Sequence, residues 1–118
     1  MDKVKHSEMV TTLVKPGDAI LASMTPDKAD MMHAAIGVAG EAGELLDAIK
    51  KAVIYDKPLD LENVVEELGD LEFYMEQLRQ RLSITREQTL DANIAKLSKR
   101  YEGLRYSDAA AQNRADKA

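Results

Sequence analysis

The sequence predicts an all-α fold, an antiparallel bundle of about four main helices in a single domain. Its 118 residues suit one domain. Aromatic residues make up only 4% of the chain, so aliphatic side chains, Met and Ala must fill the core, a composition that favours helices packed on helices. Apolar residues also recur at helical spacing between short breaks, and short connections between long helices imply antiparallel neighbours.

The first 24 residues are expected to form an N-terminal helical arm. Apolar residues within 4–14 indicate a short helix, which Lys15-Pro16-Gly17 ends. A further short helical turn is expected within 18–24.

A long helix is predicted to follow. Thr25-Pro26-Asp27 places a hydroxyl cap before a proline at the first helical position, so the helix should run from there to about Tyr55. It contains three glycines, and each lowers helix stability by roughly 1 kcal/mol relative to Ala. We therefore expect a partner helix or a ligand to approach closely at these positions, which are Gly37, Gly40 and Gly43.

Two more helices are predicted, over about 60–82 and 86–101, and they complete a helical core of residues 25–101. The first should carry a wide buried stripe, and Thr85 and Gln88 form a capping-box pattern for the second. Residues 102–118 are expected to be a tail with at most a short helix. The stripe is Leu61, Val64, Val65, Leu68, Leu71, Met75, Leu78 and Leu82.

Composition excludes several classes of function. The net charge is −5 and no long run of Lys or Arg is present, which argues against binding a nucleic-acid polymer. Without cysteine there is no disulfide, thiolate zinc site or Cys nucleophile. Neither a signal-peptide core nor a stretch of about 18 apolar residues occurs, so we expect a cytoplasmic protein with no membrane partner.

Two pairs of carboxylates are the strongest candidates for chemistry. Glu41 and Glu44 are three residues apart on one predicted helix, and so are Glu67 and Asp70 on the next, with Glu66 beside them. Clustered carboxylates repel one another unless protons or cations neutralise them. Oxygen ligands select hard cations, and Mg²⁺ that keeps waters for a phosphate substrate is the natural occupant. A single such pair is usually only a solvated helix face, but two pairs on neighbouring helices favour a metal site.

Several other side chains are candidates to bind a substrate. Asn93, Lys96 and Arg100 form one polar stripe that is suited to phosphate oxygens, although an ordinary solvated face has the same pattern. Lys51 is a further candidate for phosphate contact. His33, two turns before Glu41, is as consistent with helix packing as with contact to a base or a phosphate. Three aromatic residues are candidates to stack on a base, with core packing favoured for Phe73; they are Tyr55, Phe73 and Tyr74.

Together these residues resemble the MazG-like nucleoside triphosphate pyrophosphohydrolases, in particular small single-domain members of phages and bacteria. That family has an ExxE pair followed by an ExxD pair, as in Glu41/Glu44 and Glu67/Asp70 here. The resemblance covers roughly residues 25–117 and includes Arg114-Ala115-Asp116-Lys117. Many relatives carry a doubled acid before the first pair, where this chain has Gly40-Glu41, so a fifth ligand from that helix is not implied.

The resemblance implies hydrolysis between the α- and β-phosphates of a nucleoside or deoxynucleoside triphosphate, giving a monophosphate and pyrophosphate. Mg²⁺, with Mn²⁺ as a substitute, would be held by Glu41, Glu44, Glu67 and Asp70. Water would attack in line, with Glu66 or a ligand carboxylate accepting its proton. Phosphate charge would be stabilised by Lys96 and Arg100, and an oxygen would be oriented by Asn93. Relatives form dimers or tetramers, so a homodimer or homotetramer is implied.

Three alternatives to this reading differ in how well they fit the sequence. A di-iron carboxylate bundle requires two Glu-x-x-His motifs, which the sequence lacks. A non-catalytic helical interaction module is disfavoured because all four acids are present together with Lys96 and Arg100. Phosphoribosyl-ATP pyrophosphohydrolase shares the chemistry, and the motif alone does not exclude it.

Overall fold

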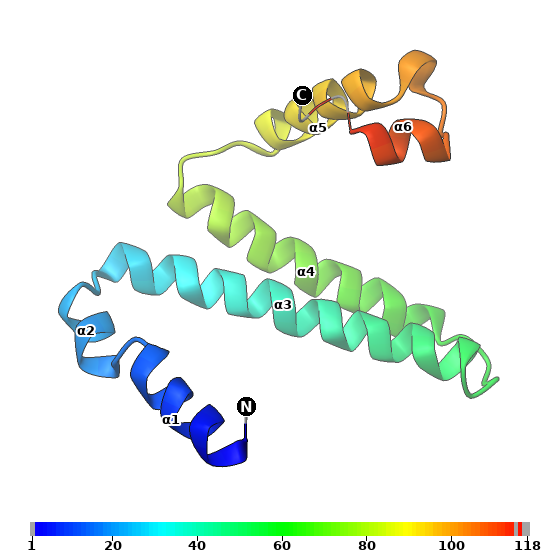
Figure 1. Ribbon diagram of the computed structural model, residues 1–118. Coiled ribbons are helices and arrows are strands. Elements are labelled where there is room, and N and C mark those ends of the chain that lie inside the picture. Colours follow the sequence, from blue (N-terminus) through cyan, green and yellow to red (C-terminus); the bar gives the residue numbers. More distant parts are fainter. Residues whose placement is uncertain (1, 115, 117–118) are drawn as a thin grey trace.

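The computed structural model describes residues 2–114 and 116. All regular structure in this part of the chain is helical, which confirms the predicted all-α class. No helix within it is both long and apolar enough to cross a membrane. The elements, shown in Figure 1, are α1 (Lys3–Leu13), α2 (Gly17–Ala22), α3 (Pro26–Val53), α4 (Leu61–Arg81), α5 (Arg86–Arg100), the 3₁₀ helix η1 (Glu102–Leu104) and α6 (Asp108–Asn113).

Local capping explains why the main helices begin where the sequence predicts. The Thr25 side chain accepts a hydrogen bond from the backbone N–H of Lys28, and a proline follows it at the first helical position. At α5 the predicted capping box forms in full, because Thr85 and Gln88 each accept a bond from the other's backbone N–H. The predicted boundaries of the three main helices agree with the structure to within about two residues.

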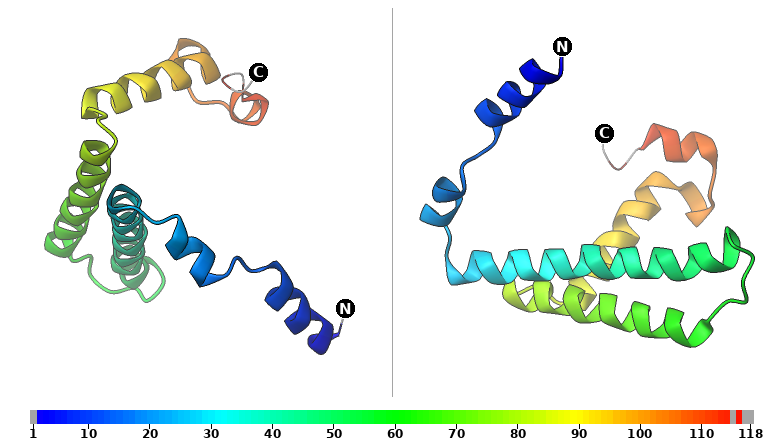
Figure 2. Two further views of the ribbon diagram at one scale, coloured as in Figure 1. Left: turned by 90° about the vertical axis from the view of Figure 1, so that its left-hand side faces the viewer. Right: turned by 90° about the horizontal axis from the view of Figure 1, so that it is seen from below.

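Helices α3 and α4 pack side by side as an antiparallel hairpin (Figures 1 and 2). At its open end Arg81, the last residue of α4, pairs with Asp27 in the first turn of α3 at 3.2 Å. Alternating three- and four-residue spacing, as in a coiled coil, relates the shielded positions along the seam. They are Met31, Ala34, Val38, Glu41, Leu45, Ala48 and Ala52 on α3, and Val64, Glu67, Leu71, Tyr74 and Leu78 on α4.

The rest of the chain extends away from this hairpin. Helix α5 packs on η1 and α6 to form a C-terminal unit, while α1 and α2 leave the other side of the hairpin as an arm (Figure 2). The radius of gyration is 20.0 Å, against about 13.5 Å for a compact chain of this length. Ala34 and Ala48 are the buried apolar residues among those described. One copy of the chain therefore has almost no enclosed core.

The expectation of a wide buried stripe on α4 is wrong for the single chain. Leu61 is 65% exposed and Val65 61% exposed, and Leu68 and Leu82 are exposed as well. The reason is geometric: one partner helix covers only a narrow row of α4, and the stripe is wider than that row. On α3 several apolar residues are exposed in the same way, among them Ile36, Leu46 and Val53.

Candidate metal centre

Two glutamates occupy the middle of the seam between α3 and α4, at positions where the spacing otherwise brings mainly apolar residues. These are Glu41 on α3 and Glu67 on α4, and both are partly shielded from solvent. Asp70 follows Glu67 by one turn and is exposed. One carboxylate oxygen from each of Glu41, Glu67 and Asp70 lies within 4.8 Å of the other two. We call these three residues the acid trio.

Glu67 is the member of the trio whose negative charge is most strongly disfavoured by its surroundings. One of its oxygens, Oε2, is buried and has no hydrogen-bond partner among the described residues. The pKa of Glu67 is raised above its ordinary value by burial first, then by the hydrogen bond that its protonated form donates to Glu41, and by the charges of Glu41, Asp70 and Glu44. A shielded carboxylate surrounded by carboxylates requires a proton or a cation to neutralise it.

The donor set fits a divalent cation. All three members of the trio offer carboxylate oxygens, which are the ligands of hard cations. Asp70 is exposed, so one side of the trio is open to solvent and to a ligand. A bound cation would give the orphaned Oε2 of Glu67 the positive partner that the described residues do not provide.

Glu44, Glu66 and Lys51 are among the predicted site residues that lie outside the trio. Glu44 and Glu66 are exposed, although the charge of Glu44 is close enough to raise the pKa of Glu67. Lys51 forms a 3.1 Å ion pair with Asp47 one turn earlier on α3. The structure thus brings together three of the four acids expected to bind metal.

The chain matches a known protein-family model. The model of the MazG nucleotide pyrophosphohydrolase domain matches residues 32–104, which is more than half of the chain and contains the whole acid trio. The chain belongs to the MazG nucleotide pyrophosphohydrolase family. No curated protein and no solved structure matches this chain. Membership supports nucleotide pyrophosphohydrolase activity in general, and it agrees with the all-α fold.

Within the MazG domain a polar and aromatic cluster continues the seam from the acid trio toward the open end of the hairpin. A Cβ atom at Gly37 would lie 2.2 Å from Cδ1 of Tyr74, so glycine is what allows this ring to pack against α3. His33 meets the Tyr74 ring edge-on at 6.0 Å, and its Nδ1 lies 3.4 Å from Nε2 of Gln77. The predicted close approach is confirmed at Gly37, whereas a Cβ at Gly40 would meet nothing within 4 Å.

Sequence reasoning missed Gln77 in this cluster. Its Oε1 is buried without a hydrogen-bond partner among the described residues, like the orphaned oxygen of Glu67. The signal was available, because Gln77 continues the row of Glu67, Asp70 and Tyr74 at helical spacing. The preference for core packing of Phe73 is wrong in the single chain, where this side chain is 66% exposed.

The remaining predicted ligands of the substrate lie on α5, at some distance from the MazG acid trio in the same chain. Asn93, Lys96 and Arg100 belong to the C-terminal unit, which does not pack along the hairpin (Figure 1). Arg100 instead forms a two-point ion pair with Asp116, with Nε–Oδ1 at 2.8 Å and Nη2–Oδ2 at 3.2 Å. This pairing raises the pKa of Arg100 and lowers the pKa of Asp116. Sequence reasoning assigned no role to Asp116, which lies beyond the MazG match.

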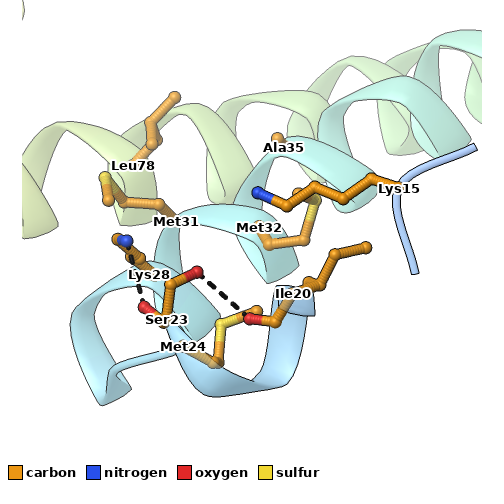
Figure 3. A pocket seen from close by; sticks show the side chains of 9 residues that line it. All are labelled: Lys15, Ile20, Ser23, Met24, Lys28, Met31, Met32, Ala35 and Leu78. Atoms are coloured by element: carbon orange, nitrogen blue, oxygen red, sulfur yellow. Dashed lines mark hydrogen bonds between the residues drawn. The ribbon is translucent and has the colours of Figure 1, made fainter. Parts of the chain in front are cut away.

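An apolar cavity of about 430 Å³ lies between α2 and the open end of the hairpin (Figure 3). Methionine and aliphatic side chains make up most of its wall, with Lys28 donating to the backbone oxygen of Ser23 at its edge. It contains no member of the acid trio and none of the other predicted site residues. We therefore do not assign it to the MazG site.

Proposed function

We propose that this chain is a Mg²⁺-dependent nucleoside triphosphate pyrophosphohydrolase that cleaves between the α- and β-phosphates. The observation that carries the proposal is the acid trio, in which the buried Oε2 of Glu67 has no partner within the described chain. Family membership supports the reaction class. Mn²⁺ is the expected substitute cation, since it accepts the same oxygen ligands.

In this proposal the trio residues bind the cation and orient it toward the triphosphate. When bound, the cation supplies charge neutralisation and polarises the phosphates. Glu44, one turn after Glu41, would be the fourth acid to hold the cation. Glu66 is exposed beside the trio, where it can accept a proton from the attacking water.

The phosphate-binding role of Asn93, Lys96 and Arg100 requires α5 to approach an acid trio. Because α5 does not pack on its own hairpin, we propose that the protein is a homodimer or homotetramer in which a second copy covers the apolar faces of the first. The accessible surface supports this, since it is 9585 Å² against about 6,400 Å² for a compact monomer of this mass. An excess of this order is what obligate oligomers bury.

We propose that the chain is divided into an arm, a catalytic core and a tail. Residues 25–101 form the catalytic core, which corresponds to most of the family match. Residues 1–24 form an arm, and 102–118 form a tail.

Pyrophosphate release from a panel of ribo- and deoxyribonucleoside triphosphates with Mg²⁺ tests the proposed reaction. Phosphoribosyl-ATP belongs in the panel, because the related pyrophosphohydrolase would prefer it. We expect release from at least one nucleoside triphosphate, and its loss with EDTA and in Glu67→Gln. Glu62→Gln, an exposed acid earlier on α4, is the matched control and should retain activity.

Two results would overturn the proposal. Release from phosphoribosyl-ATP alone would transfer the chain to the related enzyme class. A folded protein that neither hydrolyses any member of the panel nor binds Mg²⁺ would be an interaction module. The oligomer is tested separately by light scattering coupled to size exclusion, where Leu46→Glu on the exposed face of α3 should lower the measured mass; a monomeric wild type would contradict it.

A further inference from the structure

One flank of α4 leads from the acid trio toward the open end of the hairpin. Asp70, Phe73, Gln77 and Gln80 follow one another at three- or four-residue spacing, so their side chains share one face of this helix. Phe73 is 66% exposed, and Gln80 is exposed as well. A ligand held at Asp70 can therefore extend along this flank.

Two adjoining cavities lie along the flank, with volumes of about 360 Å³ and 330 Å³. Gln77 and Gln80 belong to the walls of both, so the two cavities form one continuous groove. Phe73 adds an aromatic ring to the wall of the first, and Asp30 and Arg81 bound the second. We call the space between these five side chains the glutamine groove.

Gln77 is the side chain of the groove whose hydrogen bonding is incomplete. Its Nε2 lies 3.4 Å from Nδ1 of His33, while its Oε1 is buried and has no partner among the described residues. An acceptor in this state destabilises the fold unless a donor reaches it. The terminal torsion of a glutamine is broad, so this oxygen can turn toward the groove that the same side chain bounds. The missing partner is a donor group of a ligand.

The neighbouring polar groups already use donors within the chain. Gln80 donates from Nε2 to Oε2 of Glu76 at 3.1 Å. Arg81 forms an ion pair with Asp30 at 2.5 Å. The bond to Glu76 does not involve the carbonyl oxygen of Gln80, which can accept beside that of Gln77. The groove therefore favours a ligand whose edge offers N–H groups.

The position of the groove suits one end of a nucleotide whose other end is at the acid trio. Gln77 lies seven residues after Asp70, which is about 10 Å along the helix axis. That distance is comparable with the separation between the edge of the base and the α-phosphate in a nucleotide. Phe73 lies between these two residues in the sequence and presents an exposed ring on which a base can stack.

We propose that the glutamine groove binds the base of the nucleotide, with Phe73 as its stacking surface and Gln77 as the residue that selects bases with an exocyclic amino group. Adenine and cytosine carry this group, whereas hypoxanthine and uracil carry a carbonyl oxygen in its place. That carbonyl would face the Gln77 oxygen, and turning the amide over would sacrifice the contact with His33. A site built to bond a polar group rejects an analogue that lacks it. The inference rests on the proposed function in taking a nucleotide as the ligand.

Equilibrium titration of the full-length protein with nucleoside monophosphates in Mg²⁺ tests the selection without requiring hydrolysis. AMP is compared with IMP, and CMP with UMP, because each pair exchanges an amino group for a carbonyl. In at least one pair we expect the amino-bearing member to bind about tenfold more tightly. Gln77→Met removes both hydrogen-bonding groups at similar size and should abolish this preference. Gln112→Met, the same change at an exposed position of α6, is the matched control and should retain it.

Phe73→Ala tests the stacking surface separately. Because stacking does not depend on the groups at the edge of the base, this change should weaken the binding of both members of a pair by about tenfold and leave their ratio unchanged. A lower molecular mass of Phe73→Ala with unchanged affinity would show that a second copy covers this ring, and the stacking role would be wrong.

Equal binding within both pairs, or no binding of any monophosphate, would overturn the inference. A preference that survives Gln77→Met would overturn the role of Gln77. Circular dichroism checks that the helices of the variants are intact, and Gln77→Leu repeats the test if Gln77→Met fails to fold. Hydrolysis of triphosphates without any preference for an amino group would leave the proposed function standing and remove this inference. Selective binding without hydrolysis would do the reverse.

Discussion

The hairpin and the C-terminal unit each contain a shielded carboxylate, and their surroundings shift the pKa values of these two carboxylates in opposite directions. Asp116 in the C-terminal unit faces Arg100, and its pKa is lowered. Glu67 in the hairpin faces Glu41 and Asp70, and its pKa is raised. One carboxylate is therefore neutralised within the chain, whereas the other depends on something from outside. Shielding alone does not indicate a ligand site, but shielding without an internal partner does.

The largest expected effect comes from neutralising the carboxylate that lacks a partner. Glu67→Gln should reduce Mg²⁺-dependent hydrolysis by at least about 100-fold, because it removes a charged ligand at the centre of the trio. The same change should raise the melting temperature in EDTA, since it relieves repulsion between like charges in the seam. Calorimetric unfolding of the two proteins in EDTA measures the change in melting temperature. Pyrophosphate release with Mg²⁺ measures the change in hydrolysis.

The control for this prediction is Glu62→Gln, which changes the same kind of charge outside the trio. It should leave the activity unchanged and should not raise the melting temperature in EDTA, because Glu62 lies in the first turn of α4, where an acid stabilises the helix. If Glu67→Gln lowered the melting temperature in EDTA, Glu67 would already be satisfied in the metal-free protein, and the contrast with Asp116 would disappear.

The packing of the hairpin is tested at its tightest contact. Gly37→Ala should lower the free energy of unfolding by about 1–3 kcal/mol, because the added methyl group overlaps the Tyr74 ring. Gly69→Ala, where a Cβ would meet nothing within 4 Å, should instead raise it by about 0.5–1 kcal/mol. Urea unfolding followed by circular dichroism gives both values. Destabilisation by Gly69→Ala would mean that a second copy packs at this point of α4.

A smaller effect is expected at the start of α5. Thr85→Ala removes one half of the capping box and should cost about 1 kcal/mol of helix stability. Amide hydrogen exchange resolved by residue is the suitable measurement, and it should show faster exchange in the first turn of α5 with the hairpin unchanged. Faster exchange throughout α4 would show that the two regions unfold as one unit.

The smallest effect concerns the acid stability of the C-terminal unit. The folded pKa of Asp116 is lowered, so its pairing with Arg100 stabilises the fold above the ordinary aspartate pKa of about 3.9. That contribution is lost as the pH falls through the lowered pKa. NMR of the Arg100 Nε–H signal from pH 6 downward should follow this loss, whereas Asp116→Asn should show no such transition. A signal that is unchanged at the lowest pH would contradict the ion pair.

The sequence predicted best what depends on neighbouring residues. The starts of α3 and α5 followed from Thr25 and Thr85, because a cap is made within one helical turn. The burial of Leu61 and Val65 was mispredicted, since hydrophobic spacing indicates which face prefers to be covered and does not reveal whether the same chain covers it.

The candidate site, like the fold, was predictable only in part. Spacing alone identified Glu41, Glu67 and Asp70, which the hairpin brings together. It did not separate them from Glu44, because the position of a helical residue relative to the seam depends on how two helices cross. Asp116 was not predictable for a similar reason: its partner lies sixteen residues away, and η1 and α6 lie between them, so no local pattern indicates the pairing.

The hairpin also has a consequence for how the protein folds. Its long helices are consecutive in the chain and are joined by the short segment 54–60, so their pairing can begin beside this connection and extend toward the open end without first closing a long loop. In the proposed oligomer, the faces that remain exposed in one copy would be covered when copies meet, and that step would depend on concentration. We therefore expect refolding in two stages, a rapid one that is independent of protein concentration and a slower one that accelerates as the protein is concentrated.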